Sequence, residues 1–163
     1  MLVLSPRWLF VYPGAALLLA GSLIGAPLLF GPIHLGPVEL DVHTLMYCVS
    51  ATLLGFQAVA FGLLSRTFAE NEGLVPADPI LARLQGALSV ELGLVVGIVL
   101  FVFGVLNAAL AVRFWGTTGF GPLQPDDLLR SVILSTAAMA LGGELVLLSF
   151  FLGTLRLARR RAA

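Results

Sequence analysis

An uncharged apolar run at residues 43–65 constrains the fold of this 163-residue chain more than any other feature. In an α-helix, a run of this length spans roughly 34 Å, which exceeds the bilayer hydrocarbon thickness of about 30 Å. Arg66 ends the run, and the segment that follows, residues 67–90, is much more polar. The sequence therefore predicts a helix that crosses a membrane, followed by a segment at the membrane interface.

Three more segments of the chain are long and apolar enough to cross a bilayer. The chain is 59% apolar and only 11% charged, whereas soluble domains carry about 25% charged residues. We therefore predict an all-α integral membrane protein with a single domain, 1–163. It is expected to be a four-helix bundle with an interfacial cytoplasmic segment at 67–90, and its helices are expected at about 8–30, 43–65, 92–112 and 128–155.

The distribution of arginines predicts how the chain is oriented. If both termini and the 67–90 segment share one side, that side holds seven of the nine basic residues: Arg7, Arg66, Arg83, Arg156, Arg159, Arg160 and Arg161. The other side holds Arg113 and Arg130. Because basic residues concentrate on the cytoplasmic side of membrane proteins, we expect both termini in the cytoplasm and the chain in the cytoplasmic (inner) membrane.

Glu144 is the most informative single residue, because it lies near the middle of the fourth predicted span. An acidic side chain at that depth costs about 2.5–3.5 kcal/mol on insertion scales. Gln57 lies at a similar depth in the second span, so a contact between the two side chains would satisfy both. We favour this packing role, while a proton-coupled or substrate-binding carboxylate stays open as the alternative.

Other candidate sites in the sequence are weaker. The residues His34, Glu39, Asp41 and His43 match no metal-ligand spacing, and Asp41 is equally suited to cap a helix, so we expect no metal. The sequence contains no nucleophile elbow, Walker loop or zinc-protease motif, so we assign no catalytic residue and expect no cofactor. Zero net charge gives no basic field to attract nucleic acid. Whether the chain takes part in an enzyme stays open.

Two pairs of glycines at a spacing of four indicate close helix packing. Gly21 and Gly25 form one pair, and Gly93 and Gly97 form the other. Small residues at this spacing let helix backbones approach each other. We expect these contacts within the bundle or between copies of the chain, so a homo-oligomer is one possible partner arrangement alongside the lipid bilayer.

Several strings of the sequence resemble a known membrane region. They are SPRWLFVYPG, LDVHTLMYCVSATLLGFQAVAFGLLSRTFAENEGLVPADP, FGPLQPDDLLRSVIL and LLSFFLG. In this order they cover nearly the whole chain. The region they resemble is the C-terminal transmembrane region of bacterial family-2 glycosyltransferases of the polyprenyl-phosphate type, similar to dolichyl-phosphate mannose or glucose synthases. One departure is Glu144, where the family pattern leads us to expect glutamine.

The resemblance implies a function as well as a fold. In that family a cytoplasmic GT-A domain carries the catalytic acids, and the membrane helices that follow present the lipid-phosphate acceptor. The sequence begins just before SPRWLF, so we expect the catalytic domain to be a separate partner, and no catalytic residue is carried over. A rim of arginines is the candidate site for the lipid phosphate: Arg7, Arg66, Arg83 and Arg156. The alternatives are a small transporter or lipid flippase that uses Glu144, and a structural assembly subunit.

Overall fold

The structure, a computed structural model, describes residues 7–76, 89–117, 119 and 125–162. Within these residues, four helices are long and apolar enough to cross a membrane. This confirms the predicted fold class of a helical integral membrane protein. Most of the predicted interfacial segment, including Arg83, lies outside the described residues.

The helices are longer than the predicted apolar spans. A short π-helix, η2 (Arg7–Val11), leads into α1 (Tyr12–Leu28), and α2 covers Val42–Asn71. The second half contains α4 (Val90–Thr117) and α5 (Pro125–Ala162). Helix α2 continues past Arg66 because the Arg66 Nε donates a hydrogen bond of 3.1 Å to Glu70 Oε1 one turn later. Residues 67–71, predicted to lie in the interfacial segment, are therefore helical.

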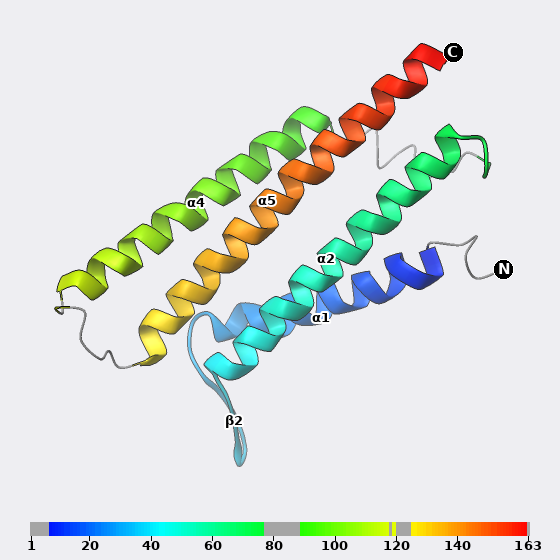
Figure 1. The fold of residues 1–163 in the computed structure, drawn as a ribbon. Helices are drawn as coiled ribbons and strands as arrows, with labels where there is room; N and C mark the ends of the chain where they lie inside the picture. The colour runs from blue at the N-terminus through cyan, green and yellow to red at the C-terminus, as the bar shows by residue number, and fades with distance from the viewer. Residues whose placement is uncertain (1–6, 77–88, 118, 120–124, 163) are drawn as a thin grey trace.

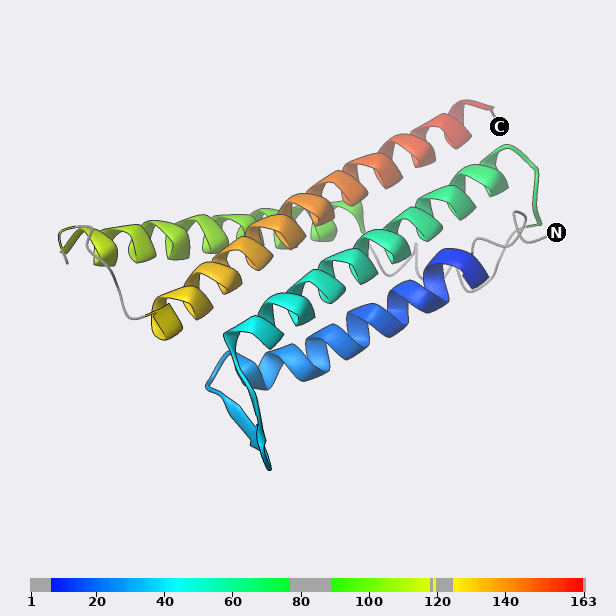
Figure 2. The ribbon, with the colours of Figure 1, turned by 60° about the horizontal axis from the view of Figure 1, so that its bottom comes forward.

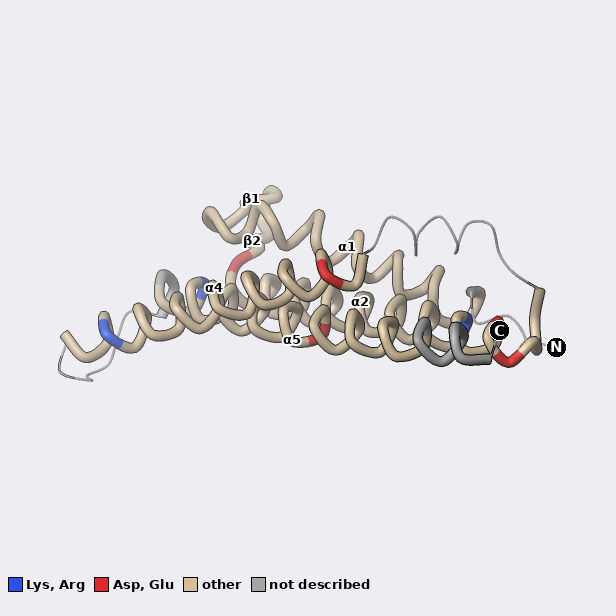
Figure 3. The backbone as a smooth tube through the Cα atoms, turned by 90° about the horizontal axis from the view of Figure 1, so that it is seen from above, with Lys and Arg blue, Asp and Glu red and all other residues tan. Residues whose placement is uncertain are grey.

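The helices form two hairpins that lie beside each other. Helices α2 and α5 occupy the centre, with α1 outside α2 and α4 outside α5 (Figure 1). Figure 2 shows α2 again between α1 and α5, with α4 crossing behind α5. The most extensive contacts join α4 to α5 and α1 to α2, followed by α2 with α5. Seen from above, the helices carry few charged residues along their length (Figure 3).

Small residues seven positions apart hold each hairpin together. A side chain added at Gly21 of α1 would place its Cβ 2.5 Å from the carbonyl oxygen of Cys48 in α2. At Gly104 of α4, a Cβ would lie 2.7 Å from the carbonyl oxygen of Ser135 in α5. The backbones therefore touch, as small residues in membrane helices allow. The buried small residues at this spacing are Gly14 and Gly21 in α1, Cys48, Gly55 and Gly62 in α2, Gly97, Gly104 and Ala111 in α4, and Ser135, Gly142 and Ser149 in α5.

The connection between α1 and α2 contains a small β-hairpin that the sequence analysis did not predict. Strands β1 (Ile33–Leu35) and β2 (Val38–Leu40) pair antiparallel, with Leu35 opposite Val38. Gly36 between them has a φ of 61°, a conformation that favours glycine at a tight hairpin turn. We call the end of the molecule that carries this turn the hairpin end. The opposite end, where η2 begins and α2 and α5 end, is the terminal end (Figure 1).

The orientation inferred from the arginines predicts a labelling pattern. Leu35, in the β-hairpin, and Thr117, at the end of α4, lie at the hairpin end. In a Cys48→Ala background, Leu35→Cys and Thr117→Cys are expected to react with a membrane-impermeant thiol reagent only from outside the cell. Glu72→Cys, at the terminal end, is the control and is expected to react only from the cytoplasmic side. Reaction of Leu35→Cys or Thr117→Cys from the cytoplasm would reverse the orientation.

Candidate functional site

Three polar contacts join the α2 side of the molecule to α5. One lies at the hairpin end, one at mid-depth and one at the terminal end. At the hairpin end, the Arg130 guanidinium pairs with Asp41, the residue before α2. At mid-depth, Gln57 Nε2 donates a hydrogen bond of 2.5 Å to Glu144 Oε1. At the terminal end, Asn71 Nδ2 donates to the carbonyl oxygen of Leu155 at 3.0 Å. Polar contacts between membrane helices contribute about 0.6 kcal/mol on average, so this interface, the α2–α5 seam, is held by modest interactions.

The middle contact joins the two side chains that the sequence analysis paired by their depth. Gln57 projects from α2 and Glu144 from α5, so their hydrogen bond links one hairpin to the other. The second carboxyl oxygen, Glu144 Oε2, is buried and has no hydrogen-bond partner among the described residues. Burying a polar atom without a partner is costly, so the site retains an unused hydrogen-bonding group in the membrane interior.

The residues considered for a metal site are held in separate contacts. His34 Nε2 lies 3.9 Å from Glu39 Oε1 across the β-hairpin. Asp41 occupies the N-cap position of α2, but its side chain makes no capping hydrogen bond and pairs with Arg130 instead. The prediction of Asp41 as the N-cap residue is therefore confirmed for its position but not for its side chain, because the carboxylate pairs with an arginine that is only 15% exposed.

The arginines proposed to bind phosphate are described to different extents. Arg66 makes two hydrogen bonds within its own segment: besides its contact with Glu70, its Nη2 donates a hydrogen bond of 3.1 Å to the carbonyl oxygen of Pro76. A guanidinium has five N–H donors, so these contacts use two of them. Arg7 begins η2 and Arg156 lies in the last turns of α5, so their backbones are at the terminal end together with Arg66. Arg83 lies outside the described residues.

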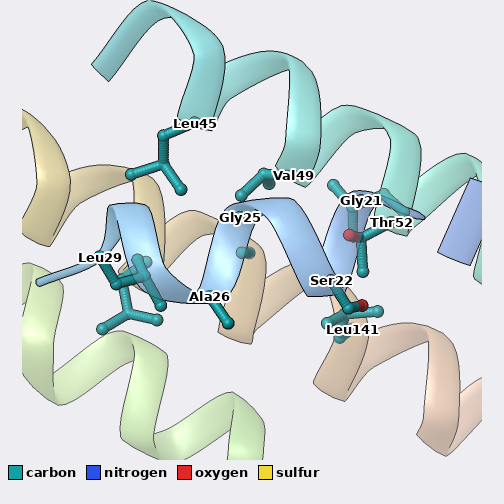
Figure 4. A pocket seen from close by; sticks show the side chains of 12 residues that line it. Gly21, Ser22, Gly25, Ala26, Leu29, Leu45, Val49, Thr52 and Leu141 are labelled. Carbon is teal, nitrogen blue, oxygen red and sulfur yellow. The ribbon is translucent and has the colours of Figure 1, made fainter. Parts of the chain in front are cut away.

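An apolar groove runs along the seam in the half near the hairpin end. It has a volume of about 210 Å³ and is formed by α1, α2 and α5. Figure 4 shows Gly21, Gly25 and Ala26 of α1 beside Leu45 and Val49 of α2. Because these α1 residues have small side chains, they leave room for the groove beside α1. From α5 it is lined by Leu134, Ala137 and Leu141.

A second groove follows in the half near the terminal end. Its volume is also about 210 Å³, and α2 and α5 form it without α1. The lining residues of the two grooves continue each other at helical spacing, so they lie on one stripe of each helix. On α5 the stripe is Leu134, Ala137, Leu141, Glu144, Leu148 and Phe151, and on α2 it is Leu45, Val49, Phe56, Ala60 and Leu64. We call the two grooves together the seam groove. Gln57 and Glu144 line the second of the two grooves, at its end nearest the first.

Comparison with known proteins decides the family. The family model of the glycosyltransferase family 2 C-terminal transmembrane region matches residues 63–156, which is more than half of the chain. The chain belongs to this family. A curated relative is the low-salt glycan biosynthesis hexosyltransferase Agl6 of Haloferax volcanii, which is 30% identical over 155 residues. The match covers 95% of this chain and 36% of that protein, so the chain spans about a third of its relative's length. No solved structure matches.

The part matched to the glycosyltransferase family 2 transmembrane region begins inside α2 and includes all of α4 and most of α5. It therefore contains Glu144, Arg66 and Asn71, whereas Gln57 and Asp41 precede it. Sequence reasoning missed the pairs Asp41–Arg130 and Asn71–Leu155. The first had a usable signal, because Asp41 and Arg130 are opposite charges at the same end of the second and fourth predicted spans. The second had none, because Asn71 bonds to a backbone carbonyl.

Proposed function

We propose that this chain is the membrane module of a polyprenyl-phosphate glycosyltransferase system, which holds the lipid-phosphate acceptor for a GT-A catalytic domain. The observation that carries the proposal is the seam groove in a member of the family 2 transmembrane region. The hexosyltransferase activity in the relative's name supports a sugar-transfer system. In this proposal the chain lies in the cytoplasmic membrane, with its terminal end in the cytoplasm.

The groove has the dimensions and chemistry that a polyprenyl tail requires. From Leu45 to Leu64 along α2, the helix rises roughly 28 Å, close to the bilayer hydrocarbon thickness of about 30 Å. The lining is almost entirely hydrocarbon apart from Gln57, Glu144 and small hydroxyls. A tail in this groove would place the phosphate at one end of the seam.

The terminal end is the better place for the phosphate because arginines concentrate there. Guanidinium groups bind phosphate through charge-assisted, often bidentate hydrogen bonds. Arg66 is the described candidate, with three N–H donors beyond those used by Glu70 and Pro76. In this proposal the other members of the rim are Arg7, Arg83 and Arg156.

A lipid flippase or small proton-coupled transporter is the second candidate function. The observation that favours it is the buried, unpartnered Oε2 of Glu144 in the membrane interior, since acidic groups at this depth often take part in transport. Glu144→Gln separates the two functions. It keeps the hydrogen-bonding shape needed for packing but removes the ionisable group, so lipid-phosphate binding is unchanged under the first proposal, whereas proton-coupled transport is lost under the second.

Blocking the groove tests the proposed function directly. Ala60→Trp places a large side chain in the groove wall, and we expect it to weaken binding of a fluorescent polyprenyl phosphate by about tenfold or more, equivalent to about 1.4 kcal/mol. Ala109→Trp, at an exposed position of α4 away from the groove, is the matched control and is expected to bind normally. Unchanged binding by Ala60→Trp, or no binding by the original protein, would contradict the proposal.

A further inference from the structure

The two kinds of helix contact in this protein differ in chemistry. Within the hairpins, the helices meet through glycines whose missing side chains let backbones touch. A Cβ at Gly97 of α4 would lie 2.9 Å from the carbonyl oxygen of Gly142 in α5, and one at Gly14 of α1 would lie 2.9 Å from the carbonyl oxygen of Gly55 in α2. Contacts this close leave the paired helices little freedom to separate or slide without losing dispersion energy along their whole length.

The α2–α5 seam has no such glycine contacts among the described residues. The membrane-helix glycines that approach another helix all approach the partner in their own hairpin: Gly14, Gly21, Gly25, Gly55 and Gly62 in the first, and Gly93, Gly97, Gly104, Gly142, Gly143 and Gly153 in the second. Across the seam there are instead the three polar contacts, an apolar cluster at the hairpin end in which Ile133 of α5 packs with Leu28 and Leu45 of the first hairpin, and, between the helices, the apolar groove. A seam of this kind can open by exchanging a few hydrogen bonds and side-chain contacts, without disrupting either hairpin.

We propose that the α1–α2 and α4–α5 hairpins are two rigid units that move against each other at the α2–α5 seam, with the Gln57–Glu144 hydrogen bond as the latch. Breaking this bond lets the seam widen sideways toward the bilayer. The widened seam admits a lipid chain from the membrane into the seam groove. The movement stands on the contacts described above, whereas the identity of the lipid rests on the proposed function.

The position of Gln57 and Glu144 explains why they form the latch. They line the second groove at its end nearest the first, whereas the other two polar contacts lie at the ends of the seam. In lipid, separated amide and carboxyl groups find no water to replace their hydrogen bond, so the closed form is favoured and the open form is a minor state. A lipid chain that binds the open seam shifts the population toward it.

Distances between spin labels test the movement without any lipid ligand. In a Cys48→Ala background, pairs of labels are placed at exposed positions: Leu54 and Phe150 across the seam, Leu19 and Leu54 within the first hairpin, and Val99 and Phe150 within the second. Glu144→Leu is expected to shift the cross-seam distance distribution to longer values and to broaden it. Both within-hairpin distributions are expected to stay narrow and unchanged.

Three further variants make the result specific. Glu144→Gln is expected to keep the original cross-seam distances, because an amide still accepts the hydrogen bond from Gln57. Gln57→Leu removes the same bond from the other side and is expected to reproduce the shift, which keeps the test valid if Glu144→Leu does not fold. Asn107→Leu is the control, since Asn107 bonds to the Phe103 carbonyl of its own helix. It is expected to change no distance.

The outcomes distinguish failure of the proposed seam movement from failure of the proposed function. If the cross-seam distances are unchanged in both Glu144→Leu and Gln57→Leu, or if the within-hairpin distances broaden equally, the two-unit movement is wrong. Association of a fluorescent polyprenyl phosphate with Glu144→Leu is expected to be faster than with the original protein. Failure of the original protein to bind this lipid would overturn the proposed function, whereas the distance measurements would still decide whether the seam opens.

Discussion

Gly142→Ala is expected to destabilise the protein strongly, whereas Gly143→Ala, one residue further along α5, is expected to leave it nearly unchanged. A Cβ at Gly142 would lie 2.5 Å from the backbone nitrogen of Phe101 and 2.7 Å from the carbonyl oxygen of Gly97. Backbone atoms cannot turn aside as a flexible side chain can, so α4 and α5 would have to separate. At Gly143, the nearest atom to an added Cβ is Phe101 Cδ2 at 4.0 Å, an ordinary contact.

The pair of variants controls for the helix propensity of the substituted residue. Both replace a mid-helix glycine by alanine, which by itself favours the helix by roughly 0.5–1 kcal/mol. Overpacking costs about 1–3 kcal/mol and more where the backbone must move. The free energy of unfolding in mixed micelles, measured by titration with a denaturing detergent, is therefore expected to fall for Gly142→Ala and to stay level or rise for Gly143→Ala. Equal free energies would show that the hairpin is not packed backbone to backbone.

Much of the fold was predictable because bilayer thickness constrains apolar segments so strongly. The uncharged run at residues 43–65 and the three similar segments predicted four spans, and the structure has four such helices. The helix ends were not predictable in the same way. Hydropathy detects the part of a helix that lies in hydrocarbon, whereas α2 continues to Asn71 through local hydrogen bonds such as the one from Arg66 to Glu70.

The spacing of small residues in the sequence indicates which helices pair, but only part of this pattern entered the prediction. The glycine pair at 21 and 25 and the pair at 93 and 97 indicated close helix packing, and all four glycines face a helix of their own hairpin. The longer pattern is the spacing of seven, as in Gly97, Gly104 and Ala111. A repeat of seven keeps one stripe of a helix against its partner over its whole length. It therefore specifies long hairpins rather than single crossing points.

The candidate site was predictable in part. Depth alone suggested the contact between Gln57 and Glu144, because a polar group in lipid needs a partner at its own level. The seam groove could not be predicted, since its walls are ordinary apolar residues and its volume depends on how α1 approaches α5 beside small residues such as Gly25. The pairing of Asp41 with Arg130 was not predicted, although their opposite charges at the same end of the second and fourth spans were a usable signal.

The second large effect expected is on sugar transfer, where the chain is predicted to be necessary for lipid glycosylation but inactive alone. In the proposed function, the chain supplies a groove for the acceptor tail and arginines for its phosphate, while no catalytic set was recognised in its sequence. In liposomes that contain a polyprenyl phosphate, the purified chain with a nucleotide sugar is expected to transfer nothing. Adding a GT-A catalytic domain from the same organism is expected to start transfer.

Two variants examine the contribution of Arg66 to that reaction. Arg66→Ala is expected to reduce transfer by about tenfold or more, because a hydrogen bond to a charged group contributes about 1.5–3 kcal/mol. Arg66 also contacts Glu70, so Glu70→Ala is the matched control. It removes that contact but keeps the guanidinium, and transfer is expected to be largely retained. Equal losses in the two variants would assign Arg66 a structural role.

The most direct measurement of the central claim is the transfer of a radiolabelled hexose to polyprenyl phosphate in these liposomes. It compares the chain alone, the catalytic domain alone and the two together. The account predicts labelled lipid in quantity only when both are present. Transfer by the chain alone, or equal transfer by the catalytic domain with and without the chain, would contradict it.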